Sequence, residues 1–277
     1  MKRRTIFTIL GIVILIIIAV AGFFIYPQYK SFMTVETVLY DKDLTFYLSG
    51  GGNSGMLVTD SAIVVIDSKM SKPARALYDI AREKAGAKPI VVINTHYHGD
   101  HVNGNQFYKG DKIYIGAYAK DFLSKNIEPE NQPNIFVKDS LLLNLGNESI
   151  LLVNLGQGHT YDDMVVYLVK HRILFTGDLV TNKMNPYLKK ESGADVDKWI
   201  SVLGKIIKGF DIVTVVPGHG KIGGKELPIS MFDYFTDMKT AASDSQKEKE
   251  LTAKYSSWAN IPGMSSPAAT IKYIRGK

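Results

Sequence analysis

The pattern of hydrophobic and polar positions divides the chain into an N-terminal apolar run and a longer mixed part. Residues 6–26 carry no charge, and a helix of that length, rising about 1.5 Å per residue, spans a hydrocarbon core of about 30 Å. From residue 36 to residue 68, short apolar runs alternate with turn residues such as those at 50–53, which predicts antiparallel strands. Helical and strand patterns then alternate along the rest of the chain.

Two helices are predicted from their beginnings and ends as well as their periodicity. Residues 70–86 have a proline near the start, apolar positions at helical spacing and Gly86 as a stop. Residues 194–210 have Asp195 as the N-cap and a glycine near the end. A third helical pattern covers residues 230–255 and turns polar towards its end.

Continuous apolar runs predict buried strands in the same part of the chain. They cover residues 88–95, two strands within 140–156, a hairpin over 164–177, and residues 211–218. Strands outnumber helices, and helices separate groups of strands, so we expect two packed sheets with helices outside. We therefore divide the chain into an N-terminal segment, residues 1–30, and one domain, residues 31–277.

The N-terminal segment is expected to be a transmembrane anchor. The three basic residues of the Lys2–Arg4 cluster precede the apolar run, which keeps the N-terminus in the cytoplasm and places the domain outside it. The alternative is secretion after cleavage of a signal peptide, because residues 19–21 resemble a cleavage site. The apolar part of a signal peptide usually has only about 7–15 residues, so we favour an uncleaved, single-pass anchor in the cell membrane.

Composition narrows the chemistry. The chain of 277 residues contains no cysteine, which excludes disulfides, thiolate nucleophiles and thiolate metal ligands. Its 45% hydrophobic and 22% charged residues are ordinary for a globular protein. The net charge is +6, but the basic residues form no compact stripe with aromatic residues between them, so we expect no nucleic-acid partner.

Five of the six histidines follow the ends of predicted strands. Three of them lie within the sequence NTHYHGDH, directly after the apolar run that ends near residue 93. His159, His219 and the carboxylate of Asp178 also follow apolar strands. Since loops at one edge of a sheet can meet in space, these side chains are expected to converge there.

Such a cluster is typical of a metal site. Neutral imidazole nitrogens and carboxylate oxygens suit divalent ions, zinc above all. Histidines this close together would lose solvation, or repel one another when charged, unless a metal paired them. His171, alone in a turn, is expected to be an ordinary polar residue. The predicted ligands of two adjacent ions are His96, His98, Asp100, His101, His159, Asp178 and His219.

Four short motifs carry a resemblance to a known family. They are HYHGDH at 96–101, GHT at 158–160, TGD at 176–178 and PGHG at 217–220, in that order. Together they resemble the signature of the metallo-β-lactamase-fold hydrolases, and VVIDS, ending in Asp67 and Ser68, also resembles the early strand of that family and its aspartate. The resemblance covers roughly residues 36–224 and implies an α+β fold, an αββα sandwich with the metals at one edge.

The resemblance assigns roles to the seven residues. It implies that two zinc ions are bound per chain: the first by His96, His98 and His159, the second by Asp100, His101 and His219, with Asp178 bridging both. Two close metals lower the pKa of a bridging water, and the resulting hydroxide would attack a carbonyl carbon. Asp100 would orient that hydroxide or accept its proton, and the second metal would stabilise the developing anion.

The same residues suggest a branch of the family. The subclass that uses a cysteine ligand is excluded, and Asp178 resembles the glyoxalase II and lactonase branch. Ester, thioester, lactone and β-lactam substrates all fit hydroxide attack. Relatives that reduce dioxygen with iron carry a glutamate where His98 stands, but an iron-dependent oxidoreductase similar to persulfide dioxygenases remains an alternative, as does a non-catalytic metal-binding protein.

Substrate contacts are expected from two places. The loop at 179–195 would border the cleft, with Asn182, Lys183 or Tyr187 touching a small-molecule substrate and Lys183 attracting a carboxylate. Tyr161, just after the GHT motif, could donate to an oxyanion. Tyr97, between metal-facing positions, is expected to point into the core.

Overall fold

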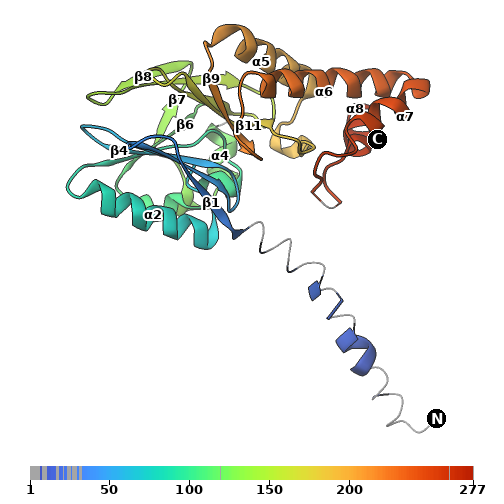
Figure 1. Cartoon of the computed structure of the whole chain (residues 1–277), viewed down its shortest axis with the longest axis horizontal. Helices are drawn as coiled ribbons and strands as arrows, with labels where there is room; N and C mark the ends of the chain where they lie inside the picture. The colour runs from blue at the N-terminus through green and yellow to red at the C-terminus, as the bar shows by residue number, and fades with distance from the viewer. Residues whose placement is uncertain are drawn as a thin grey trace.

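The computed structural model describes Phe7, residues 11–16, 19–20 and 22–23, Tyr26, Lys30, and residues 33–118, 120–261 and 263–276. The expected N-terminal anchor therefore lies largely outside the described residues, and Figure 1 draws this part of the chain mainly as a grey trace. Across the described residues, no helix is both long enough and apolar enough to cross a membrane.

The described strands form two sheets, one of seven strands and one of five. The first sheet follows chain order: β1 (Val35–Leu39), β2 (Leu44–Ser49), β3 (Ser54–Val58), β4 (Ile63–Ile66), β5 (Ile90–Ile93), β6 (Lys112–Gly116) and β7 (Ile135–Val137). The second runs β12 (Thr214–His219), β11 (Ile173–Thr181), β10 (Asp163–Leu168), β9 (Ser149–Gly156) and β8 (Ser140–Asn144). In the first sheet, pairing is antiparallel from β1 to β4 and parallel from β4 to β7. In the second sheet, β11 and β12 are parallel and the other pairs are antiparallel, so both sheets are mixed.

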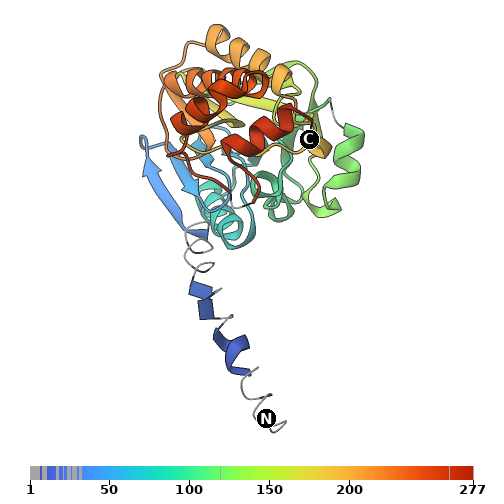
Figure 2. The same ribbon diagram turned by 90° about the vertical axis from the view of Figure 1, so that its right-hand side faces the viewer.

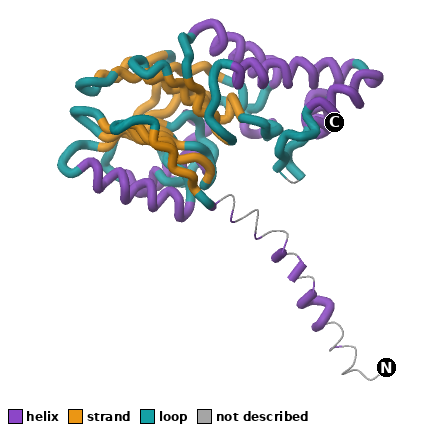
Figure 3. Tube along the Cα trace, in the orientation of Figure 1, coloured by secondary structure: helices purple, strands orange, loops and turns teal. Residues whose placement is uncertain are grey.

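Helices cover the outer face of each sheet, which gives the expected αββα sandwich. Figure 3 shows the strands as two stacked layers with helices on the outside. The helices are α2 (Ser71–Ala85), α3 (Gly99–Val102), α4 (Lys120–Asn126), α5 (Val196–Gly209), α6 (Glu226–Ser243), α7 (Ser245–Lys254) and α8 (Pro267–Ile274), with short 3-10 turns at Asn105–Tyr108, Pro129–Asn131 and Lys190–Ser192. α2 lies on the first sheet, and Figure 2 shows the C-terminal helices gathered over the second.

Apolar packing joins these layers. Between the sheets, the rings of Phe46 and Phe175 meet edge to face with centroids 5.8 Å apart, within a cluster of buried aliphatic residues. A second cluster surrounds the fully buried Trp199 of α5, and a third lies beneath α2. The helices thus hold the two sheets as a rigid base for the loops at their edges.

The structure confirms most predicted elements and corrects some boundaries. The Asp195 side chain accepts a hydrogen bond from the Lys198 N–H at 3.1 Å, as expected of an N-cap. The helix predicted over 230–255 is divided into α6 and α7, because Asp244 caps the start of α7 by accepting from the Gln246 N–H. β6 and β7 were not predicted.

Candidate metal centre

The seven predicted ligands converge at one edge of the sandwich. His96 and His98 follow β5, His159 follows β9, Asp178 lies within β11, and His219 ends β12. Their ligand atoms form two groups, each within 4.8 Å: one comprises His96, His98, His159 and Asp178, the other Asp100, His101 and His219. Residues 60 or more positions apart in sequence are therefore brought together, as predicted, although Asp178 lies within its strand and not after it.

The Asp178 carboxylate faces both groups. Its Oδ2 atom lies 3.9 Å from His96 Nε2 and 3.4 Å from His159 Nε2. Its Oδ1 atom lies 3.2 Å from His101 Nε2 and 3.3 Å from His219 Nε2. One oxygen is thus directed at each group, which is the arrangement that a bridging ligand requires.

The buried polar atoms at this point fit a pair of divalent cations. His96 Nε2, His101 Nε2 and Asp178 Oδ1 are buried and have no hydrogen-bond partner among the described residues. Leaving such atoms unpaired is costly, and native proteins rarely do so without a reason. Imidazole nitrogens and carboxylate oxygens, with no thiolate, make up a donor set suited to zinc.

In the first group, burial favours the neutral imidazole that binds metals. It lowers the pKa of His96 far below its ordinary value, and that of His159 to about 3. Burial also lowers the pKa of His98, although the charges of Asp178 and Asp100 oppose the shift. These three side chains are therefore unprotonated near neutral pH and free to donate lone pairs.

In the second group, neighbouring negative charge raises the pKa of the histidines more than burial lowers it. Burial alone would lower the pKa of His219, but Asp178 and Asp100 raise it to about 10. The same balance, with Asp67 contributing, raises the pKa of His101. The carboxylates of Asp100 and Asp178 thus favour positive charge beside them, which protons or divalent cations can supply.

Asp67 fixes the orientation of His101. Its Oδ2 atom lies 2.8 Å from His101 Nδ1, while Thr95 donates to both carboxylate oxygens through its N–H and its hydroxyl. A carboxylate on one ring nitrogen leaves the other facing the metal position. Sequence analysis placed Asp67 at the end of a strand but gave it no role in the centre.

A glycine-rich loop, residues 49–53, lies against the second group. The Gly52 N–H donates to the Asp100 carbonyl at 3.2 Å, and a Cβ atom at Gly52 would lie 2.3 Å from His101 Cε1. Asn53 holds the segment before and after His219, because its amide donates to the carbonyls of Pro217 and Gly220. Sequence analysis saw this loop only as a turn, because turn composition does not reveal what the turn contacts.

The predicted substrate loop contacts both groups. Asn182 supports the segment around His219: its N–H donates to the His219 carbonyl and its side-chain amide to the Lys221 carbonyl. Lys183 is exposed and has a left-handed backbone, with φ of 52°. The ring of Tyr187 lies 6.4 Å from that of His98.

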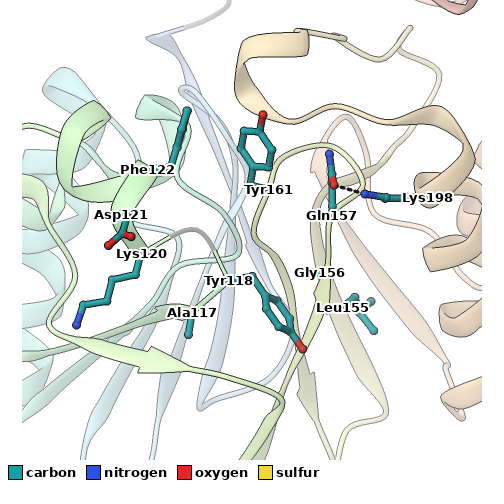
Figure 4. Close-up of a pocket in the computed structure, with 10 residues that line it drawn as sticks. All are labelled: Ala117, Tyr118, Lys120, Asp121, Phe122, Leu155, Gly156, Gln157, Tyr161 and Lys198. Atoms are coloured by element: carbon teal, nitrogen blue, oxygen red, sulfur yellow. Dashed lines mark hydrogen bonds between the residues drawn. The ribbon is translucent and has the colours of Figure 1, made fainter.

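The other two tyrosines singled out in the sequence, Tyr97 and Tyr161, lie apart from the metal-facing atoms. Tyr97 is buried and its hydroxyl donates to the Ser192 carbonyl at 2.7 Å, as expected of a core side chain. Tyr161, 37% exposed, packs against Phe122 with ring centroids 5.2 Å apart. It lines a pocket of about 740 Å³ beside α4, shown in Figure 4, together with Gln157. Among the described contacts of Tyr161, none reaches the seven predicted ligands.

The sequence profile of the metallo-beta-lactamase superfamily matches residues 49–219, which include all seven converging residues. The chain belongs to this superfamily. It is a metal-dependent hydrolase of the metallo-beta-lactamase superfamily, as its motifs predicted.

Individual relatives support this membership. The chain is 30% identical over 194 residues to a metallo-beta-lactamase type 2 from Bacillus cereus, covering 68% of this chain and 75% of the relative. A metallo-beta-lactamase type 2 from Bacteroides fragilis is 30% identical over 203 residues, covering 69% of this chain and 81% of the relative. Metallo-beta-lactamase IND-1 from Chryseobacterium indologenes is 29% identical over 188 residues, covering 65% and 78%.

Solved structures share the fold. A metallo-beta-lactamase from Pontibacter korlensis aligns with a TM-score of 0.65 at 21% identity, over 73% of this chain and 99% of that one. Metallo-beta-lactamase IND-7 aligns with a TM-score of 0.62 at 25% identity, over 73% and 97%.

These relatives correct the expected branch. Asp178 suggested glyoxalase II and lactonases, whereas the relatives above are named metallo-beta-lactamases. One ligand position therefore does not determine the branch, because the similarity extends over most of the domain. The relatives also give no support to the iron-oxidoreductase alternative.

Proposed function

We propose that this hydrolase is a binuclear zinc β-lactamase, which opens the amide bond of a β-lactam ring. The observation that carries the proposal is the Asp178 carboxylate, with one oxygen directed at each group of histidines. The names of the relatives support the substrate class. Within the centre, His96, His98 and His159 would hold one ion, Asp100, His101 and His219 the other, and Asp178 both.

Zinc bound there supplies a Lewis acid and lowers the pKa of a water ligand towards neutrality. The chain supplies the proton acceptor. The side chain of Asp100 is 21% exposed and that of Asp178 is 12% exposed, so Asp100 is the carboxylate that incoming water reaches more easily. We assign to Asp100 the role of orienting the water and holding its proton.

The loop after β11 provides the proposed substrate contacts. Tyr187 lies beside His98 and Asn182 beside His219, so the loop extends along both groups. The amine of the exposed Lys183 can pair with the carboxylate that β-lactam antibiotics carry. Tyr161 is the weaker candidate, because its ring faces Phe122.

A substrate panel tests the proposal. The purified, zinc-loaded protein is offered a chromogenic cephalosporin, a thioester and a lactone, each with and without a chelator. We expect cephalosporin hydrolysis that the chelator abolishes and added zinc restores. Turnover of the thioester or lactone alone would refute the β-lactam assignment, and a rate insensitive to the chelator would refute the metal mechanism.

A further inference from the structure

Lys69 is a buried lysine outside the seven predicted ligands. It is 1% exposed, and its ammonium group donates to the carbonyls of Tyr47, Ser49 and Gly52 at 3.0, 2.5 and 2.7 Å. A lysine ammonium has three donors, so all of them are used. Burial of a polar group is costly unless it is hydrogen-bonded, and every bond made here goes to the main chain between Tyr47 in β2 and Gly52 in the glycine-rich loop.

The backbone around Lys69 is also unusual. Asp67, Lys69 and Ser71 have φ values of 56°, 63° and 56°, in the left-handed region that side chains other than glycine rarely adopt. Three such residues within five positions direct Asp67 towards His101 and Lys69 towards the glycine-rich loop. Strained conformations persist where the surrounding structure enforces them, and they cluster at functional sites.

The glycine-rich loop contacts Asp100 and His101 of the second group and the main chain next to His219. A Cβ atom at Gly51 would lie 3.1 Å from Asp100 Cβ, and one at Gly52 would collide with the His101 ring. Beyond them, the Asn53 N–H donates to the carbonyl of Gly218, next to His219. The loop therefore fits closely around Asp100, His101 and the segment of His219.

Among the described residues, the Lys69 ammonium makes no hydrogen bond to the first group. His96 and His98 are carried by the loop after β5, and His159 by the loop after β9. The three hydrogen bonds of the Lys69 ammonium all end in the segment from Tyr47 to Gly52. Loss of the ammonium should thus disturb one group selectively.

We propose that Lys69 is a positioning residue for the second metal group. By tying the carbonyls of Ser49 and Gly52 in the loop to that of Tyr47 in β2, it holds the loop against Asp100, His101 and the His219 segment, and so would retain the second ion without touching it. The inference rests on the proposed two-metal centre but not on the β-lactam substrate. Outer residues that orient metal ligands typically change metal affinity by about 10–100-fold when they are replaced.

The test is zinc titration of the full chain against a competing fluorescent chelator, which resolves two dissociation constants. We expect Lys69→Met to bind the first zinc as the wild type does and the second about 10–100-fold more weakly. Lys88→Met is the matched control, since Lys88 also donates from its ammonium to a carbonyl, that of Thr59, at 2.8 Å. Its two constants should equal those of the wild type.

The outcomes separate the inference from the proposed centre. Two unchanged constants in Lys69→Met, or equal losses in both, overturn the role of Lys69 while the centre stands. A wild type that binds fewer than two zinc ions overturns the centre itself. If Lys69→Met does not fold, Lys69→Gln, which keeps two N–H donors on a shorter side chain, is judged by the same criteria: it should bind the first zinc as the wild type does and the second more weakly.

Discussion

At the metal centre, two buried carboxylates lie among the histidine side chains. The carboxylates of Asp100 and Asp178 are surrounded by imidazole rings, and their negative charge raises the pKa of His219 to about 10 although burial opposes it. The two carboxylates thus place negative charge at the metal centre, where water has little access. Divalent ions satisfy that charge and the unpaired nitrogen atoms together.

Another buried carboxyl, Asp162, should make stability depend on pH. Burial raises its pKa to about 7, although the Asn154 amide donates to it, and its Oδ2 atom has no hydrogen-bond partner among the described residues. Because this value exceeds the ordinary pKa of about 3.9, the folded state binds the proton more tightly than the unfolded chain. The resulting stability is fully present below about pH 4 and is lost as pH rises through 7.

We therefore expect Asp162→Asn to remove this dependence. The free energy of unfolding of the variant, relative to the wild type, should rise between pH 4 and pH 8 by an amount on the order of 2 kcal/mol. Denaturant titrations across this range, at constant zinc, measure the difference, in which contributions independent of Asp162 cancel. A difference that stays constant with pH contradicts the interpretation.

At the scale of elements, the glycine-rich loop should tolerate no side chain where it meets His101. In Gly52→Ala the new Cβ would lie 2.3 Å from the ring, so we expect a loss of about 1–3 kcal/mol in stability together with weaker zinc binding. Thermal unfolding and zinc titration measure the two effects.

Gly204→Ala is the matched control for that substitution. Gly204 lies within α5, and a Cβ there would have no atom within 4 Å. The control should gain up to about 1 kcal/mol, because alanine is the better helix residue. If both variants behave alike, the loop is not closely fitted to His101.

The substrate loop is held by the C-terminal part of the chain. Asn185 is fully buried, its N–H donates to the Ala259 carbonyl at 2.8 Å, and its side-chain amide donates to Asn260. The Ala259 N–H donates in return to the Lys183 carbonyl. Residues beyond the 49–219 match thus support the loop that borders the metal centre.

We expect Asn185→Ala to loosen this loop. Loss of the buried hydrogen bonds should cost about 1–3 kcal/mol in stability and raise KM more than it lowers kcat, since the metal ligands remain in place. Steady-state kinetics with a chromogenic cephalosporin and hydrogen exchange of residues 182–194 measure both. A fall in kcat at constant KM would contradict a substrate-binding role.

The sequence predicted those helices and strands whose apolar pattern or capping residues are visible along the chain. Asp195 caps the start of α5 as a local signal predicts, and the histidines converge because the ends of β5 in the first sheet and of β9 and β12 in the second lie at the same edge of the sandwich. Contacts such as Lys69 with the glycine-rich loop, or Asn185 with Asn260, leave no periodic pattern. They depend on how distant segments pack, which one sequence does not reveal.

At the scale of the whole molecule, the αββα sandwich acts as a rigid frame for one edge. Its two sheets meet through the apolar core between them, while the ligands lie on the loops after β5 and β9, on the short α3, within β11 and at the end of β12. The C-terminal helices extend this frame over the second sheet: Tyr273 of α8 donates to the Ala194 carbonyl near the end of the substrate loop. The metal centre therefore depends on contacts spread over most of the domain.

We propose that residues 1–30 tether this domain to the cell membrane, outside the cytoplasm, because the uncharged run follows a basic cluster. The protein should then remain with the membrane fraction at high salt and be digested by protease added to intact spheroplasts. N-terminal sequencing of the mature protein provides the control. A mature chain that begins at Gly22 would show a cleaved signal peptide instead.

The most direct measurement is anomalous X-ray scattering at the zinc edge from crystals grown with zinc. We expect two peaks on opposite sides of the Asp178 carboxylate, one beside His96, His98 and His159 and the other beside Asp100, His101 and His219. A single peak, or two peaks that do not share Asp178, would contradict the binuclear centre on which the proposed function rests.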